Sequence, residues 1–182
     1  MTVFRQRFPA WEDLRLAFAG CVFVIHVWAI LNLLDALPAF LLRLTPYEVA
    51  GVISYPLVFA LLESLLVWSL VVLAAIVFPR RWLRGRFLTR GMALVLFTAL
   101  FSIAIHFNYE DLVKNLQYLP LWASIYLILT LICVYWVGRS QHVDAILRAA
   151  LQRIEVLSYL YIFMDVFGLF IVISRNILSN GT

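Results

Sequence analysis

Long apolar runs alternate with short polar segments along the 182 residues of the chain. A bilayer core needs roughly 20 apolar residues for each helical crossing, so apolar runs of this length predict membrane-spanning helices. Five crossings are predicted, over residues 16–34, 49–78, 92–107, 119–137 and 156–173. We therefore expect a single transmembrane domain over residues 1–182, without a separate soluble domain.

The segment between the fourth and fifth crossings has a mixed pattern. Apolar residues recur at helical spacing over residues 143–154, while Asp144, Arg148 and Arg153 fall on other faces. This pattern predicts a short amphipathic helix on the cytoplasmic side. It either lies on the membrane or runs on into the fifth crossing.

A capping motif marks the start of the second helix. Thr45 precedes Pro46, and Glu48 lies three residues after Thr45. Threonine is a favoured N-cap residue, proline suits the first helical position, and the glutamate can accept a hydrogen bond from the amide of the cap. We expect the second helix to begin at this motif.

The composition indicates lipid as the solvent. The chain is 65% hydrophobic and 13% charged, whereas soluble domains carry about 25% charged residues. We therefore expect an all-α integral membrane protein with five transmembrane helices. The two cysteines, Cys21 and Cys133, each lie inside an apolar run, so neither a disulfide framework nor a metal site is indicated.

The distribution of basic residues predicts the orientation. Eleven of the fourteen Lys and Arg residues flank the crossings on the side of the N-terminus, and three lie on the other side. Cytoplasmic loops carry the excess of basic residues, so the N-terminus is expected in the cytoplasm and the C-terminus outside. A bacterial plasma (inner) membrane is the expected location.

Five arginines lie in the loop between the second and third crossings. They are Arg80, Arg81, Arg84, Arg86 and Arg90. Because this loop directly follows a crossing, we expect anionic lipid headgroups to bind there rather than nucleic acid.

Three ionisable residues lie near the middle of predicted crossings. His26 belongs to the first crossing, Glu63 to the second and Asp165 to the fifth. A charged side chain at this depth costs roughly 2.5–3.5 kcal/mol on insertion scales, so each residue needs a partner, water or a bound proton. Their similar depth predicts a shared polar centre at the membrane midplane. Pairing of an acid with His26, with Asn32 or with a tyrosine is the structural alternative.

Other polar residues favour the same region. Thr98, Ser102 and His106 follow one another at four-residue spacing on the third crossing. On the fifth, Tyr161 and Gly168 share a face with Asp165, which can pack closely and still form hydrogen bonds. We include the stripe on the third crossing in the candidate ion or proton pathway.

Two functions remain open at this point. In the first, an oligomer conducts or relays protons, an ion or a small cation through the polar centre. In the second, the chain is a non-catalytic subunit or anchor of a larger membrane complex, with its acids paired structurally. Either way we expect a homo-oligomer or partner membrane subunits.

Catalysis and cofactor binding are not favoured. The glycine-flanked aspartates of membrane aspartyl proteases, an HExxH metal motif and a phosphate-binding loop are all absent from the sequence. Haem ligation by His26 and His106 would need ligands at one height, but their positions differ by about 9 Å. We expect no cofactor.

Overall fold

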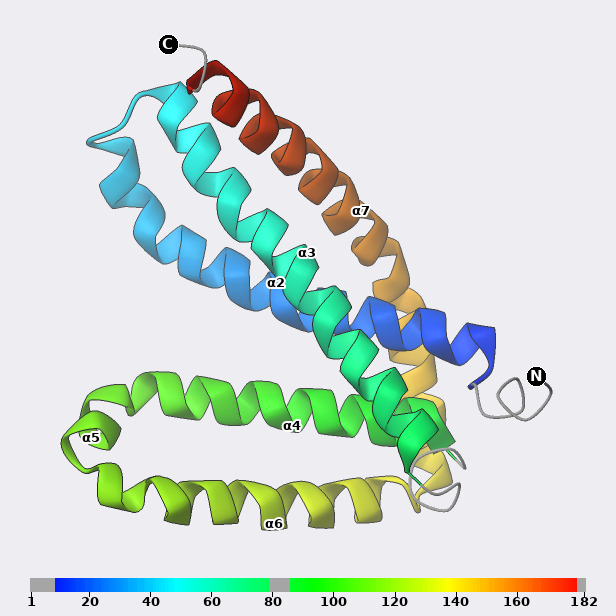
Figure 1. Cartoon of the computed structure of the whole chain (residues 1–182). Helices are drawn as coiled ribbons and strands as arrows, with labels where there is room; N and C mark the ends of the chain where they lie inside the picture. Colours follow the sequence, from blue (N-terminus) through cyan, green and yellow to red (C-terminus); the bar gives the residue numbers. More distant parts are fainter. Residues whose placement is uncertain (1–8, 79–85, 180–182) are drawn as a thin grey trace. The chain divides into compact units, whose positions relative to one another are not determined.

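The computed structural model describes residues 9–78 and 86–179, and every regular element in these two ranges is helical. Figure 1 shows the helices in chain order. Their bounds are α2 (Trp11–Leu41), α3 (Pro46–Val77), α4 (Phe87–Phe107), α5 (Tyr109–Lys114), the 3-10 helix η2 (Leu116–Tyr118), α6 (Leu119–Val137) and α7 (Gln141–Ser179).

Five of these helices are long and apolar enough to cross a membrane. The prediction of an all-helical protein with five such helices is confirmed to this extent. α6 coincides with the predicted fourth crossing, and its 19 residues span roughly 28 Å at 1.5 Å per residue. That length is close to the thickness of a bilayer core.

α7 is a single helix of 39 residues. The segment predicted as a short amphipathic helix forms its first part, so the second of the two expected arrangements, continuation into the fifth crossing, is the one observed. Neither proline nor glycine interrupts the helix before Gly168, which gives the chain no local reason to stop. The predicted apolar face differs in detail, because Ile146 is 70% exposed whereas Leu151 is buried.

The capping motif forms at the start of α3 as predicted. Both the backbone N–H and the hydroxyl of Thr45 donate to Oε2 of Glu48, each at 2.8 Å. Pro46 is the first residue of the helix. The bonds from Thr45 give the helix a defined start.

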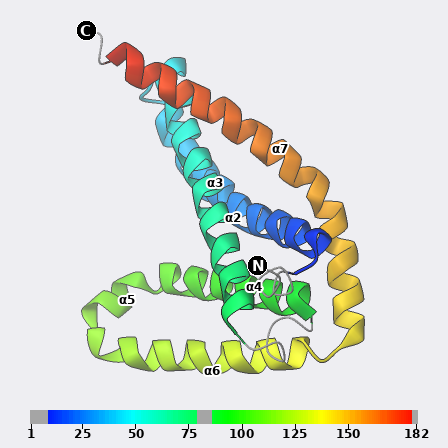
Figure 2. The ribbon, with the colours of Figure 1, turned by 45° about the vertical axis from the view of Figure 1, so that its right-hand side comes forward.

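The helices belong to two compact units, and some helices contribute to both. The first unit comprises Met1–Ala17 and Leu70–Leu151. Within it, α4 and α6 form a hairpin closed by α5 and η2, which Figures 1 and 2 show from two directions. Aromatic rings hold the hairpin together: the ring of Phe101 lies 4.5 Å from that of Tyr126 and 6.1 Å from that of Trp122.

An ion-pair network joins three helices of the first unit. Arg148 of α7 donates to Asp13 of α2 at 2.6 Å, and its Nε lies 3.8 Å from Asp144 of α7. The hydroxyl of Thr89, on α4, donates to the carboxylate of Asp144. The sequence placed Asp144 and Arg148 on a polar face, and the structure shows that this face contacts neighbouring helices.

The second unit comprises Phe18–Ser69 and Gln152–Thr182. Here α7 packs against both α2 and α3. The hydroxyl of Ser158 donates to the carbonyl of Ala19 at 3.1 Å. A Cβ atom at Gly168 would lie 3.4 Å from the carbonyl oxygen of Ser54, an ordinary van der Waals contact, so α7 lies close to the α3 backbone here and a larger side chain would not fit.

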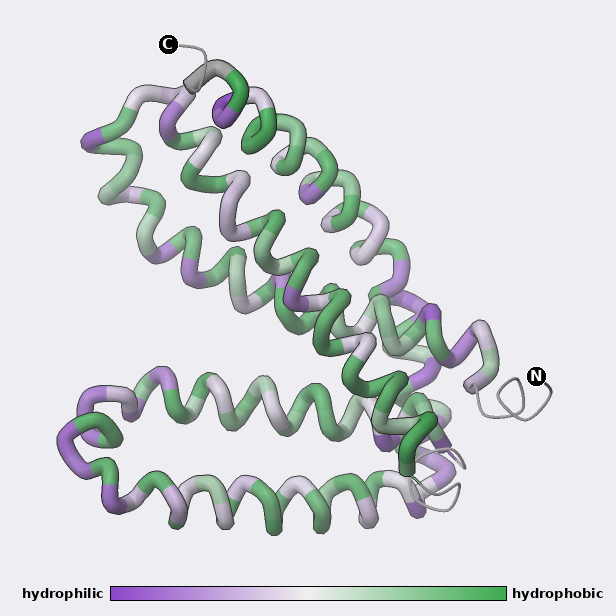
Figure 3. Tube along the Cα trace, viewed as in Figure 1, coloured by the Kyte–Doolittle hydropathy of each residue, from purple (hydrophilic) through white to green (hydrophobic). Residues whose placement is uncertain are grey.

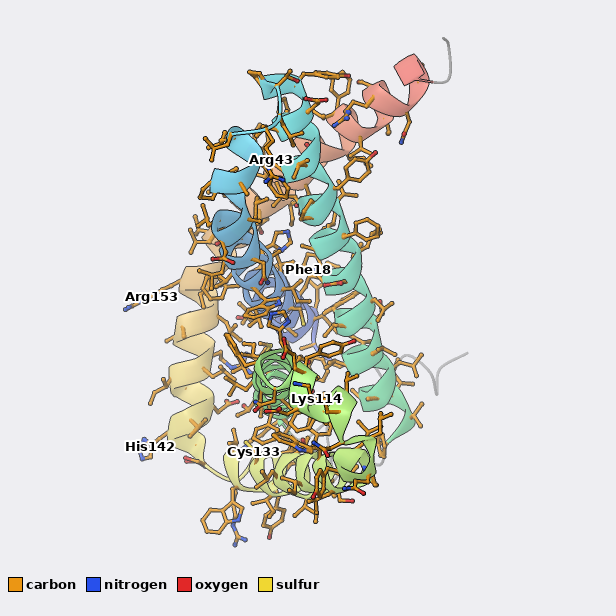
Figure 4. The ribbon with its side chains drawn as sticks, turned by 90° about the vertical axis from the view of Figure 1, so that its left-hand side faces the viewer. Phe18, Arg43, Lys114, Cys133, His142 and Arg153 are labelled. Atoms are coloured by element: carbon orange, nitrogen blue, oxygen red, sulfur yellow. The ribbon has the colours of Figure 1, made fainter. Side chains whose placement is uncertain are left out.

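Burial in these helices differs from that in a soluble bundle. Small polar side chains such as Ser54, Ser64 and Ser158 are buried, and many large apolar side chains, such as Phe163 and Phe170, are exposed. Figure 3 shows apolar residues along the helices and polar residues concentrated at the turns, including the one between α4 and α6. Arg153 extends away from α7 into its surroundings (Figure 4). Lipid is the solvent that favours such a surface.

Candidate intramembrane polar site

The site centres on a buried histidine–aspartate pair in the second unit. α2 carries His26 and α7 carries Asp165. The Nε2 atom of the histidine lies 3.0 Å from Oδ1 and 3.1 Å from Oδ2 of the aspartate. Both side chains have an exposed fraction of 0%. Two of the three predicted midplane residues therefore meet, 139 positions apart in sequence.

The contact of the second ring nitrogen of His26, Nδ1, shows which ring nitrogen carries a proton. Nδ1 lies 2.8 Å from the carbonyl oxygen of Val22. A carbonyl only accepts, so Nδ1 carries a proton and donates it. Nε2 then either donates to an ionised Asp165 or accepts from its protonated carboxyl group. In both arrangements the two side chains share one proton and have no net charge.

Neutrality explains how the pair is tolerated in an apolar interior. Adding or removing a proton would leave a net charge surrounded by low-dielectric groups, which is costly. The carboxylate and the imidazole also satisfy each other's hydrogen-bonding capacity, and a buried pair that is fully satisfied fixes the geometry around it. The pair thus suits a role as a fixed contact between α2 and α7.

Tyr161 completes the surroundings of the pair. Its ring stacks on the imidazole of His26, with ring centroids 5.1 Å apart and an angle of 12° between the planes. Tyr161 lies four residues before Asp165 and Gly168 lies three after it, so all three fall on one side of α7. The predicted shared face is confirmed by the burial of Asp165 and Gly168 together with this stacking.

Glu63 is placed differently from the other two residues predicted at the midplane. Its side chain is exposed on α3, while the next residue, Ser64, is buried. Within the described part of the chain, no hydrogen bond or ion pair reaches the Glu63 carboxylate. The predicted centre of three residues is therefore a pair plus a separate carboxylate in the single chain.

The polar stripe of α4 belongs to the first unit. Thr98 donates its hydroxyl proton to the carbonyl of Leu94 at 2.8 Å, so the Tyr126 hydroxyl, 2.7 Å away, is the donor in their contact. Ser102 and His106 are exposed. The stripe contributes to the contact of α4 with α6 at Thr98.

Two of the five loop arginines lie in the described residues. Arg80, Arg81 and Arg84 lie outside them. Arg86 is the N-cap residue of α4 and makes no side-chain cap bond. Arg90 lies against the end of α6, since a Cβ atom at Gly138 would overlap its side chain. A cation at this position is favourable because the C-terminal end of a helix is partly negative.

Arg175 makes a contact that the sequence reasoning missed. Its guanidinium carbon lies 5.3 Å from the ring centroid of Tyr47. A Cβ atom at Gly51 would overlap the guanidinium group, so the glycine makes room for it. Gly51, one turn into an apolar helix, is the only signal in the sequence that a neighbouring group approaches here.

Among the described residues, no group of three His, Cys, Asp or Glu side chains is arranged to hold a metal ion. Comparisons with protein-family models, with curated proteins and with solved structures found no match to this chain. The chemistry of the site is therefore the basis for assigning a function.

Proposed function

We propose that this protein is a non-catalytic subunit of a membrane assembly and that it associates through the face of α3 that carries Glu63. One observation supports this more than any other: the exposed carboxylate lies near the middle of α3. Glu63 comes 17 residues after Pro46 and 14 before Val77, the two ends of the helix.

Lipid cannot satisfy a carboxylate at this depth. An acid exposed at the bilayer centre costs roughly 2.5–3.5 kcal/mol on insertion scales. Association that covers Glu63 with a hydrogen-bond donor removes this penalty, and burial of the neighbouring apolar side chains adds packing. Assembly is therefore the simplest use for the exposed acid.

The His26–Asp165 pair supports a scaffold role for the second unit. Its two side chains are fully buried and hydrogen-bonded to each other, and the pair is positioned to hold α2 against α7. Such a contact keeps the neighbouring α3 in a fixed environment for a partner.

The proposal includes an orientation and a location. The N-terminus lies in the cytoplasm and the C-terminus outside, in a bacterial plasma membrane, with the arginines at the start of α4 near anionic headgroups. The excess of basic residues on one side supports this orientation.

A second candidate function is conduction or relay of protons or a small cation in an oligomer. The exposure of Glu63 favours it, because a carboxylate on an oligomer interface could line a polar path. Asp165 would not belong to that path, since its side chain is fully buried.

Two measurements on the full chain separate the candidates. The first is the size of the solubilised native complex for wild type and for Glu63→Gln, with Glu110→Gln, at an exposed position of α5, as the control. The second is proton and potassium flux in liposomes that contain the protein. A subunit role predicts a smaller complex for Glu63→Gln alone and no flux; flux that Glu63→Gln abolishes supports conduction. An unchanged complex in both variants contradicts the proposal.

A further inference from the structure

We infer that the occupant of the Glu63 face is a transmembrane helix of a different protein that carries one basic residue at the bilayer midplane. This inference rests on the proposed function and specifies the chemistry of the partner. It follows from the surroundings of Glu63 and from the positions of the basic residues in this chain.

The surface around Glu63 supplies no donor of its own. Its neighbours on the exposed side of α3 are Phe59, Leu62 and Leu66, with exposed fractions of 60%, 55% and 60%. One carboxylate is thus surrounded by large apolar side chains. A partner helix that fits this surface is apolar, with a single strong donor opposite the acid.

A second copy of this chain does not offer such a donor. Every described Lys or Arg residue lies outside the predicted apolar crossings; these are Arg15, Arg43, Arg86, Arg90, Lys114, Arg139, Arg148, Arg153 and Arg175. Of the three histidines, His26 is buried against Asp165, His106 lies in the last turn of α4 and His142 lies at the start of α7. In a symmetric dimer with Glu63 on the two-fold axis, the two carboxylates would face each other, and two ionised carboxylates oppose association.

A basic residue satisfies the acid best. Hydrogen bonds between a cationic donor and a carboxylate are shorter and stronger than those between neutral groups. The partner's own charge is also unfavourable in lipid, so each residue removes the other's penalty when the helices meet. Because each helix carries only one charged residue in its apolar part, pairing of the two residues also fixes the register of the helices.

The inference can be tested with synthetic helices. The probes are labelled 25-residue leucine–alanine peptides with lysine or glutamine at the centre. They are mixed with the labelled full chain in vesicles of phosphatidylcholine and phosphatidylglycerol. Association is measured by fluorescence energy transfer between the two labels. We expect the lysine peptide to bind about tenfold more tightly, consistent with the measured range of interhelical polar contacts. Glu63→Gln removes the preference, and Glu110→Gln retains it.

The register provides a second test. The double variant Glu63→Leu, Leu70→Glu moves the acid by seven residues, about 10 Å along the same side of α3. Leu70 is exposed, so the change leaves the packing of the helix unaltered. This variant should prefer a peptide whose lysine is displaced by two turns toward the cytoplasmic end over the peptide with a central lysine.

Several outcomes would overturn the inference. Equal binding of the lysine and glutamine peptides to wild type is one. Self-association of the chain that Glu63→Gln weakens is another, because it identifies a second copy as the occupant. If either occurs while Glu63→Gln still reduces the native complex, the proposed subunit role stands and only the chemistry of the partner is wrong.

Discussion

Asp165 and Glu63 are both carboxylic acids near the middle of apolar helices, but they have opposite surroundings. Asp165 is fully buried and bonded to His26, whereas Glu63 is exposed on α3. The same chemical group therefore serves internal packing in one place and is available for association in the other. Single substitutions should separate these roles.

Breaking the internal pair should destabilise the fold. Removing one partner of a buried pair leaves the other unsatisfied and costs about 3–5 kcal/mol. We expect His26→Leu and Asp165→Leu each to lower the unfolding free energy in mixed micelles by about 3 kcal/mol. The double variant should lose much less than the sum of the two. Strict additivity would show that the pair is not coupled.

The sequence predicts a depth for these residues but does not predict the face of the helix on which they lie. Depth follows from the distance to the charged residues that bracket each crossing. Rotation about the helix axis is harder to predict, because α3 is apolar on all sides. The useful signal is the spacing of small residues: Ser54, Ala60 and Ser64 are all buried on one side of α3. Glu63, one residue before Ser64, points away from that side by about 100°.

At the scale of the helices, boundaries were predictable wherever a motif or a change of composition marked them. The motif of Thr45 and Glu48 marks the start of α3, and α6 begins and ends at the predicted residues. The run of charges between Arg148 and Glu155 was different. It marks the expected membrane boundary on α7 without ending the helix, because charged residues are good helix formers.

Close approach of α7 to α3 should depend on Gly168. A methyl group there would make ordinary contact with the α3 backbone, so Gly168→Ala is expected to have little effect. Gly168→Leu should force the helices apart and lower the free energy of unfolding in nanodiscs by about 1–3 kcal/mol. Phe167→Leu, on the exposed face, is the matched control. Equal stability of Gly168→Leu and wild type would show that the helices are not in close contact.

At the scale of the whole chain, the five apolar helices are what the sequence predicted most securely. Charge placement then predicts which ends lie in the cytoplasm. An alkaline phosphatase reporter fused after residue 182 should be active, and a green fluorescent protein fused there should not fluoresce. The opposite result would place the C-terminus in the cytoplasm and reverse the proposed orientation.

The most direct test of the central claim is the reactivity of the two intramembrane acids toward a hydrophobic carbodiimide, read by peptide mass spectrometry. The purified chain in detergent and the protein in its native membrane are treated in parallel. We predict that Glu63 is labelled in the purified chain and protected in the native membrane, while Asp165 stays unlabelled in both. Equal labelling of Glu63 in the two samples, or labelling of Asp165 in the folded chain, would contradict the account.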